Sequence, residues 1–186
     1  MRIGLLTGAV LWAWAAASSS ARAATPAGDD LHHGYEMGAK VGAAEPLGSV
    51  AAGADLGPAA QAFVGYEFTE GIMPTVGIDA ARWNSTGGSR WEIAALGGLR
   101  WYVLPSRVRP WGEGAAGIGQ FVYDDDAIRG RVDIGLRLRL SAGLDVAVSK
   151  LVSASVQVGV NDLRTLGTTA YDDRWLDVGC GVDLTF

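Results

Sequence analysis

The sequence of 186 residues predicts an all-β fold, an eight-stranded antiparallel up-and-down β-barrel. The first observation is the segment 131–149, in which every even position from Val132 to Val148 is apolar. A period of two is that of a β-strand whose two faces meet different surroundings. The second observation is that similar segments recur to a total of eight. The third is that the connections between them alternate between shorter and longer.

An even number of antiparallel strands closes a barrel and brings both ends of the chain to one rim. The eight predicted strands are 34–43, 60–68, 74–83, 90–103, 109–122, 131–149, 153–161 and 175–186.

Most apolar residues of the first four strands fall on one parity of each segment. Phe63 is an exception, because it places an aromatic ring on the polar parity of its strand. The apolar positions are Tyr35, Met37, Ala39 and Val41, then Ala62, Val64, Tyr66 and Phe68, then Val76, Ile78 and Ala80, then Trp91, Ile93, Ala95, Leu99, Trp101 and Val103.

The last four strands contain the clearest pattern and the most ambiguous one. Residues 109–122 are rich in glycine and alanine on both faces, so the inward and outward parity of this strand stays open. The unbroken parity of 131–149 argues against a hairpin inside it. Apolar positions of the final two strands are Ala154, Val156, Val158 and Val160, then Leu176, Val178, Cys180, Val182, Leu184 and Phe186.

Connection lengths indicate how the barrel is oriented. The connections 69–73, 104–108 and 150–152 are short and lie on the rim that carries the chain ends. On the opposite rim we expect longer loops at 44–59, 84–89, 123–130 and 162–174. Short turns beside the termini and longer loops opposite are typical of barrels that span an outer membrane.

The first 23 residues are expected to be a signal peptide rather than part of the fold. Arg2 precedes an apolar stretch of about 15 residues, short of the roughly 20 that span a bilayer as a helix, and Ala21 to Ala23 fits the small-x-small cleavage pattern. A retained membrane anchor is the weaker alternative. We therefore expect cleavage near Ala23, a leader segment at 24–33 and a barrel domain at 34–186.

Charge and cysteine content exclude some functions. Removing 1–23 takes away Arg2 and Arg22, so the 15 basic residues fall to 13 against 20 acidic ones. This balance argues against a nucleic-acid partner, which needs clustered Lys and Arg. Cys180 is the only cysteine, so an internal disulfide is excluded.

Two tryptophans indicate that the apolar face meets lipid. Trp91 and Trp101 share that face ten residues apart, which in a strand tilted by about 40° corresponds to roughly 25 Å, the height of an apolar band between aromatic girdles. We interpret them as interface aromatics of a transmembrane barrel. A soluble periplasmic β-barrel binding protein, with its apolar side chains inside, is the alternative.

Three segments resemble the small outer-membrane β-barrel superfamily, which includes the membrane domain of outer-membrane protein A and the opacity-type surface proteins. They are Arg109 to Gly119 with its Pro110-Trp111 pair, Ala142 to Val158 with its tight turn, and the C-terminal strand. The resemblance implies an outer-membrane location, with outer-membrane lipids and lipopolysaccharide as surroundings. It also implies that the barrel assembly machinery recognises the terminal strand through Val178, Cys180, Val182, Leu184 and Phe186.

The polar face is expected to point into the barrel and to form an ion-pair network, because buried charges must be paired. An eight-stranded interior is just wide enough for side chains, which favours a plugged barrel over a narrow channel for ions or small solutes. The predicted network comprises Glu36, Lys40, Glu67, Asp79, Glu92, Arg100, Glu113, Asp133, Arg137, Arg139, Asp145, Asp177 and Asp183.

The sequence predicts no catalytic residue, no cofactor and no metal site. His32 and His33 are the only histidines and precede the first strand, so a nucleophile–histidine pair inside the barrel is excluded. Asp124 to Asp126 offers carboxylates suited to divalent cations but lacks the spacing of an EF-hand, and we interpret it as a solubilising loop. We expect a non-enzymatic protein with a structural or surface-interaction role.

Overall fold

The computed structural model describes residues 34–47, 54–68, 71–85, 88–104, 106–125, 131–166 and 172–186. The predicted signal peptide, the leader and both histidines lie outside these residues, as does Asp126. Asp124 and Asp125, which the sequence assigned to a loop, instead form the end of a strand. Within the described ranges, no helix is long and apolar enough to cross a membrane.

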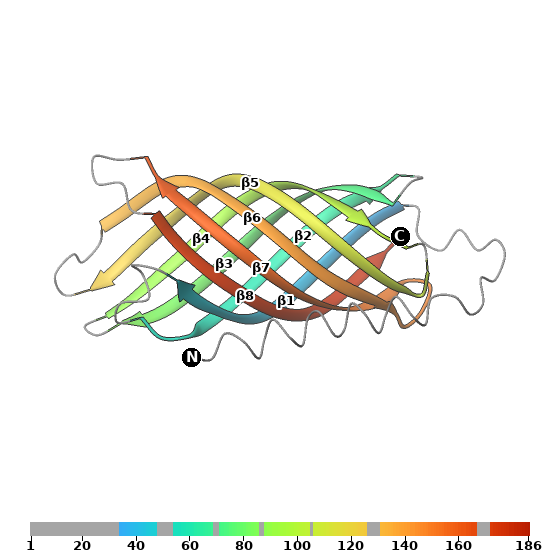
Figure 1. The fold of residues 1–186 in the computed structure, drawn as a ribbon, viewed down its shortest axis with the longest axis horizontal. Helices are drawn as coiled ribbons and strands as arrows, with labels where there is room; N and C mark the ends of the chain where they lie inside the picture. The colour runs from blue at the N-terminus through green and yellow to red at the C-terminus, as the bar shows by residue number, and fades with distance from the viewer. Residues whose placement is uncertain are drawn as a thin grey trace.

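Eight antiparallel strands close into one barrel in which each strand pairs with its neighbours in the sequence and β1 pairs with β8 (Figure 1). This confirms the predicted fold class. The strands are β1 (Gly34–Leu47), β2 (Gly57–Glu67), β3 (Ile72–Ser85), β4 (Gly88–Tyr102), β5 (Val108–Asp125), β6 (Arg131–Ala147), β7 (Val152–Thr165) and β8 (Asp172–Thr185).

Most strands extend beyond the predicted limits at the rim opposite the C-terminus, which we call the loop rim. The β3–β4 ladder continues to the pair Ser85–Gly88, so the loop expected over 84–89 shrinks to residues 86–87. Polar residues interrupt the apolar alternation of the sequence near this rim, but the backbone hydrogen bonds between β3 and β4 continue past them. The expected loop asymmetry is therefore weaker than the sequence indicated.

At the other rim, which we call the turn rim, β6 ends two residues earlier than predicted. The amides of Val148 and Ser149 both donate to the carbonyl oxygen of Val152, at 2.9 and 3.0 Å. The Ser149 hydroxyl oxygen also accepts from the amides of Leu151 and Val152. This turn takes Val148 and Ser149 out of the strand although their side chains still fit the alternation.

The apolar parity of each strand faces outward and the polar parity faces the barrel interior. Ile118, Val41 and Leu140 are 66%, 65% and 70% exposed, whereas the charged residues between the outward positions are buried. This is the arrangement predicted for a transmembrane barrel and the reverse of a soluble one. Trp91 and Trp101 lie on the same outer surface, at 41% and 47% exposure.

The structure resolves the parity of β5, which the sequence left open. Trp111, Glu113 and Phe121 are buried in the interior, whereas Ile118 and Gln120 are exposed outside. Odd-numbered residues of β5 therefore point inward, which adds a tryptophan and an arginine at position 109 to the barrel interior.

Candidate functional site

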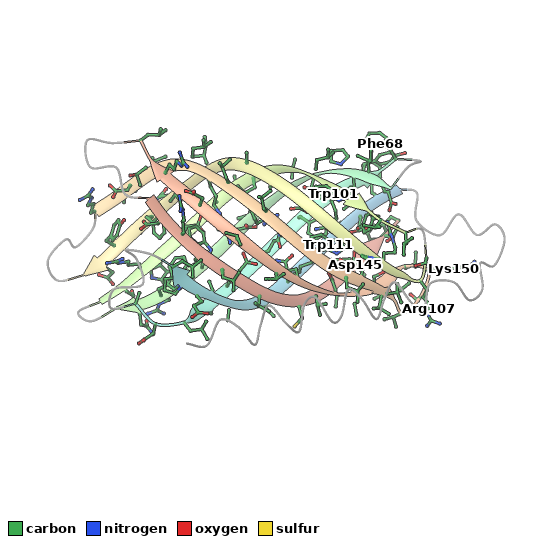
Figure 2. The ribbon with its side chains drawn as sticks, viewed as in Figure 1. Phe68, Trp101, Arg107, Trp111, Asp145 and Lys150 are labelled. Atoms are coloured by element: carbon green, nitrogen blue, oxygen red, sulfur yellow. The ribbon has the colours of Figure 1, made fainter. Side chains whose placement is uncertain are left out.

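The interior of the barrel is layered along its axis, with aromatic clusters toward both rims and charged side chains between and beside them. Figure 2 shows Trp111 and Asp145 in the half of the barrel nearer the C-terminus. Toward the loop rim, Trp83 packs with its ring centroid 5.8 Å from that of Phe121 and 5.3 Å from that of Trp175. Its indole nitrogen donates to the carbonyl oxygen of Ala44 at 3.1 Å. The loop-rim cluster consists of Ala44, Ala81, Trp83, Phe121, Tyr123, Leu163 and Trp175.

Toward the turn rim, a second cluster consists of Phe63, Met73, Tyr102 and Trp111. Phe63 is the residue that broke the polar parity of its strand, and it is 5% exposed. Large apolar side chains are thus tolerated on the inner face because they pack against each other near the end of the barrel.

Two arginines of β6 connect opposite walls of the barrel in its middle layer. Arg137 lies 3.0 Å from a carboxylate oxygen of Asp79 on β3 and 2.5 Å from one of Glu92 on β4. Arg139 lies 2.6 Å from the same oxygen of Asp79 and also pairs with Glu113 on β5. The pairs with Asp79 and Glu92 bridge strands that are not neighbours, so the two arginine side chains extend across the barrel interior at this level.

Between this layer and the turn rim, Arg100 of β4 forms further ion pairs. Its Nε lies 2.9 Å from Glu113 and one terminal nitrogen lies 3.4 Å from Glu36. The guanidinium carbon also lies 4.3 Å from the centroid of the Phe63 ring and 4.2 Å from that of the Trp111 ring. Arg100 is fully buried, so its charge is compensated by carboxylates and by aromatic faces rather than by water.

The residues of the predicted network lie on the inner face of the barrel, eleven of them buried and two, Asp133 and Asp177, half-buried. Nine belong to ion pairs within 4.0 Å: Glu36, Glu67, Asp79, Glu92, Arg100, Glu113, Asp133, Arg137 and Arg139.

The other four make different contacts. Lys40 donates to the side-chain oxygen of Gln157 at 3.2 Å and lies over the Trp111 ring. Asp177 accepts from the amide of Asn161, and Asp145 accepts from the Trp111 indole at 2.7 Å. Asp183 lies beside Glu36 and Asp145, with acceptor atoms of the three residues within 4.8 Å of one another.

Sequence reasoning missed Arg109, which lies 2.5 Å from Glu67 and 3.5 Å from the centroid of the Tyr102 ring. It also missed the interior position of Trp111. Both were hidden by the open parity of 109–122. The signal that identifies them is Glu113, already assigned to the polar face, because 109 and 111 share its parity.

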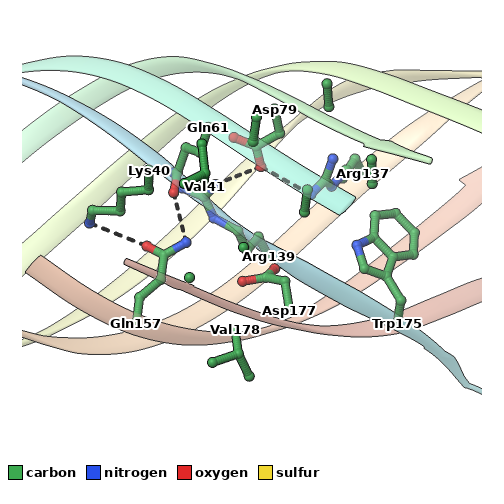
Figure 3. Close-up of a pocket in the computed structure, with 16 residues that line it drawn as sticks. Lys40, Val41, Gln61, Asp79, Arg137, Arg139, Gln157, Trp175, Asp177 and Val178 are labelled. Carbon is green, nitrogen blue, oxygen red and sulfur yellow. Dashed lines mark hydrogen bonds and ion pairs between the residues drawn. The ribbon is translucent and has the colours of Figure 1, made fainter. Parts of the chain in front are cut away.

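A small cavity of about 30 Å³ lies in the interior beside the middle layer (Figure 3). Lys40, Gln61, Gln157, Arg139 and Asp177 are among the side chains that line it. At roughly 10–15 Å³ for each ordered water, it has room for about two water molecules. Small-molecule sites are typically ten times larger, so this cavity suits water rather than a ligand.

No protein-family model and no curated protein matches the chain. Solved structures do. Neisserial surface protein A (NspA) is 16% identical with a TM-score of 0.66, over 82% of this chain and 97% of that one. Ail, the attachment invasion locus protein of Yersinia pestis, is 13% identical with a TM-score of 0.58, over 83% and 99%.

The outer membrane enzyme PagL is 16% identical with a TM-score of 0.48, over 81% and 99%. At these identities the comparisons with NspA and Ail establish the fold. The chain has the eight-stranded barrel of the small outer-membrane proteins, as the sequence resemblance predicted.

Proposed function

We propose that this barrel is a non-enzymatic integral outer-membrane protein with a closed interior, and that its role is structural or lies in interactions of its loop rim. The observation that carries the proposal is the inverted distribution of side chains, with apolar residues outside and paired charges inside. A contiguous apolar surface of this kind is costly in water and is stabilised by lipid.

Polar side chains bound the apolar belt at both rims, which supports a membrane-spanning orientation. At the turn rim, Arg107 and Lys150 lie close to the end of the barrel, with the aromatic rings of Phe68 and Trp101 nearer the belt (Figure 2). At the loop rim, the outward charges of Asp162, Arg164 and Arg174 form ion pairs at 3.6 and 3.2 Å.

Trp91 lies at the loop-rim edge of the apolar belt. The guanidinium carbon of Arg82 lies 4.7 Å from the centroid of the Trp91 ring. Tryptophan beside a cation is suited to the interface between hydrocarbon and headgroups. We therefore propose outer-membrane lipids and lipopolysaccharide as the surroundings of the belt. The loop rim faces the exterior of the cell in this orientation.

The localisation is tested by cell fractionation and by gel mobility with and without heating. The proposal expects the protein in the outer-membrane fraction, with a folded form that shifts on boiling. Recovery of the folded protein from the soluble periplasmic fraction contradicts it and supports the soluble-binder alternative.

The closed interior is tested by recording conductance of purified protein in a planar lipid bilayer. Arg137 and Arg139 reach Asp79 across the lumen, and aromatic clusters lie on either side of them, so we expect no steady conductance steps. Reproducible steps of one amplitude contradict the closed interior and favour the narrow channel.

The residue types on the inner face of the barrel support the non-enzymatic assignment. Its acids are mostly held in ion pairs with arginine, and the two histidines of the chain precede residue 34. Histidine is the usual base that activates a serine nucleophile. Hydrolysis of lipopolysaccharide acyl chains by the purified protein, measured by mass spectrometry of the lipid, contradicts this assignment.

A further inference from the structure

Three carboxylates converge inside the barrel near the turn rim. Glu36 of β1, Asp145 of β6 and Asp183 of β8 each lie two residues from the turn-rim end of their strand. One oxygen of each lies within 4.8 Å of the oxygens of the other two, and all three residues are buried. Three like charges at this separation repel one another strongly unless a positive charge lies between them.

The hydrogen bonds of this cluster leave one carboxylate without a partner. Asp145 accepts from the Trp111 indole at 2.7 Å and from the Ser155 hydroxyl at 2.6 Å. Glu36 accepts from the Tyr102 hydroxyl at 3.1 Å. Asp183 is 1% exposed, and neither of its carboxylate oxygens has a hydrogen-bond partner in the described chain.

Arg100 and Lys40, two basic residues near the cluster, each also have a partner outside it. Arg100 lies 2.9 Å from Glu113 and only 3.4 Å from Glu36. The Lys40 ammonium donates to Gln157 and lies 4.4 Å from the centroid of the Trp111 ring. Arg100 therefore shares its charge between Glu113 and Glu36, and among the described residues no ion pair within 4.0 Å joins Arg100 or Lys40 to Asp183.

The same deficit holds for the buried interior as a whole. Among buried side chains in the described ranges, eight are acidic and five are basic. The acidic ones are Glu36, Glu67, Asp79, Glu92, Glu113, Asp145, Asp173 and Asp183, and the basic ones are Lys40, Arg100, Arg109, Arg137 and Arg139. A divalent cation held by Glu36, Asp145 and Asp183 would reduce this excess.

We propose that Glu36, Asp145 and Asp183 bind one divalent cation of the Ca²⁺ type. All donors are oxygens, with no nitrogen or thiolate ligand, and hard cations prefer oxygen. Oxygens on opposite sides of a Ca²⁺ ion are about 4.8 Å apart, twice the typical Ca–O distance, so the observed separations fit a shared ion. The sequence assigned these residues to an ion-pair network, but Asp183 lacks the basic partner that such a network requires.

The bound ion would join three strands at the place where the barrel closes. Asp183 and Glu36 belong to the paired strands β8 and β1, and Asp145 belongs to β6. This assignment is independent of the role of the loop rim. The ion would stabilise the contact between β1 and β8, where the barrel closes. Its binding can be tested whether or not the proposed membrane function is correct.

The test uses the purified, refolded barrel at neutral pH, titrated with Tb³⁺ in place of Ca²⁺. Trp111 donates a hydrogen bond to Asp145, so its indole is close enough to sensitise the luminescence of a bound lanthanide. We expect a saturable signal at one ion per barrel, which Ca²⁺ displaces. Isothermal titration with Ca²⁺ alone provides a second measurement of stoichiometry.

Asp183→Asn tests the site, since it removes a ligand charge with almost no change of volume. We expect its affinity to fall by at least about tenfold, as loss of groups at metal sites typically does. Asp177→Asn is the matched control, because Asp177 lies on the same face of β8 six residues away, about 20 Å along the strand. Its affinity should equal that of the wild type.

Heat-modifiable mobility establishes that each variant is folded, and Asp145→Asn replaces Asp183→Asn if the latter does not fold. Absence of saturable binding to the folded wild-type barrel overturns the proposal. Equal affinity of Asp183→Asn and Asp177→Asn also overturns it, because binding then occurs elsewhere.

Discussion

The indole ring of Trp111 occupies the space that a side chain at Gly143, its register partner on β6, would fill. A methyl group at position 143 would overlap the ring and the carbonyl oxygen of Val156. Trp101 is placed over Gly112 in the same way on the outer surface. Cross-strand pairing of a large ring with a glycine lets the tryptophan lie along the sheet and fill a narrow lumen.

Gly143→Ala should therefore destabilise the barrel by about 1–3 kcal/mol, the typical cost of overpacking. Urea unfolding of the protein refolded in lipid vesicles measures the change. Gly97→Ala is the control, since no atom lies within 4 Å of a Cβ built there. That variant should be unchanged or more stable by up to about 1 kcal/mol. An equal loss in both variants contradicts the role assigned to Trp111.

The strands were predictable because alternation is a local property of the chain. The even apolar positions of 131–149 identify a strand whatever its neighbours are, and β6 follows them to Ala147. The polar parity likewise identified most of the inner face. Strand ends were less predictable, because the β3–β4 ladder continues through Asn84 and Ser85, whose side chains carry no apolar signal.

Partners inside the lumen were not predictable, because they depend on how the whole sheet closes. Arg109 of β5 reaches Glu67 of β2, and Arg137 of β6 reaches Asp79 of β3. Neither pair shares a hairpin, so the register of several strands must be known before the contact is visible. That Asp183 has no hydrogen-bond partner was not predictable for the same reason, because it depends on which basic side chain contacts which acid.

Arg100→Met should cost about 3–5 kcal/mol, because it leaves Glu36 and Glu113 buried without their shared cation. Unfolding by urea in vesicles measures the loss. Adding Glu36→Gln to Arg100→Met should recover part of it, since a neutral amide is less costly to bury than a carboxylate that has lost its ion-pair partner, whereas Glu113 keeps its pair with Arg139.

The control for Arg100 is Arg164→Met. Arg164 is 59% exposed and its nitrogen lies 3.6 Å from Asp162, a geometry that contributes at most about 1 kcal/mol. If the two substitutions cost the same, burial does not determine the energetics of these pairs.

The direction of each tryptophan can be tested with brominated lipids, which quench indoles in contact with them. Single-tryptophan proteins that retain Trp91 or Trp101 should be quenched, and most strongly by bromine near the headgroups, because both rings lie outside near the belt edges. Proteins that retain only Trp111 or Trp175 should be quenched little, since these rings are 1% and 2% exposed in the interior. Comparable quenching of an interior indole contradicts the orientation of its strand.

Deletion of Phe186 separates assembly in the cell from stability of the finished barrel. The Phe186 side chain is 65% exposed, so it packs little against the rest of the protein. Its amide donates to the carbonyl oxygen of Tyr35 at 2.8 Å, one backbone contact beyond the β1–β8 ladder. The purified protein without Phe186 should therefore refold and keep its heat-modifiable mobility, with a loss of about 1 kcal/mol.

In cells the same deletion should lower the amount of folded protein in the outer membrane severalfold, if the terminal aromatic residue is the feature that the assembly machinery recognises. Phe186→Trp keeps an aromatic ring at the same parity as Leu184 and Val182 and should accumulate like the wild type. Immunoblotting of unheated outer-membrane fractions measures both. A variant without Phe186 that reaches wild-type levels shows that the preceding apolar parity is sufficient for assembly, and a variant that also fails to refold in vitro shows that the residue acts through stability.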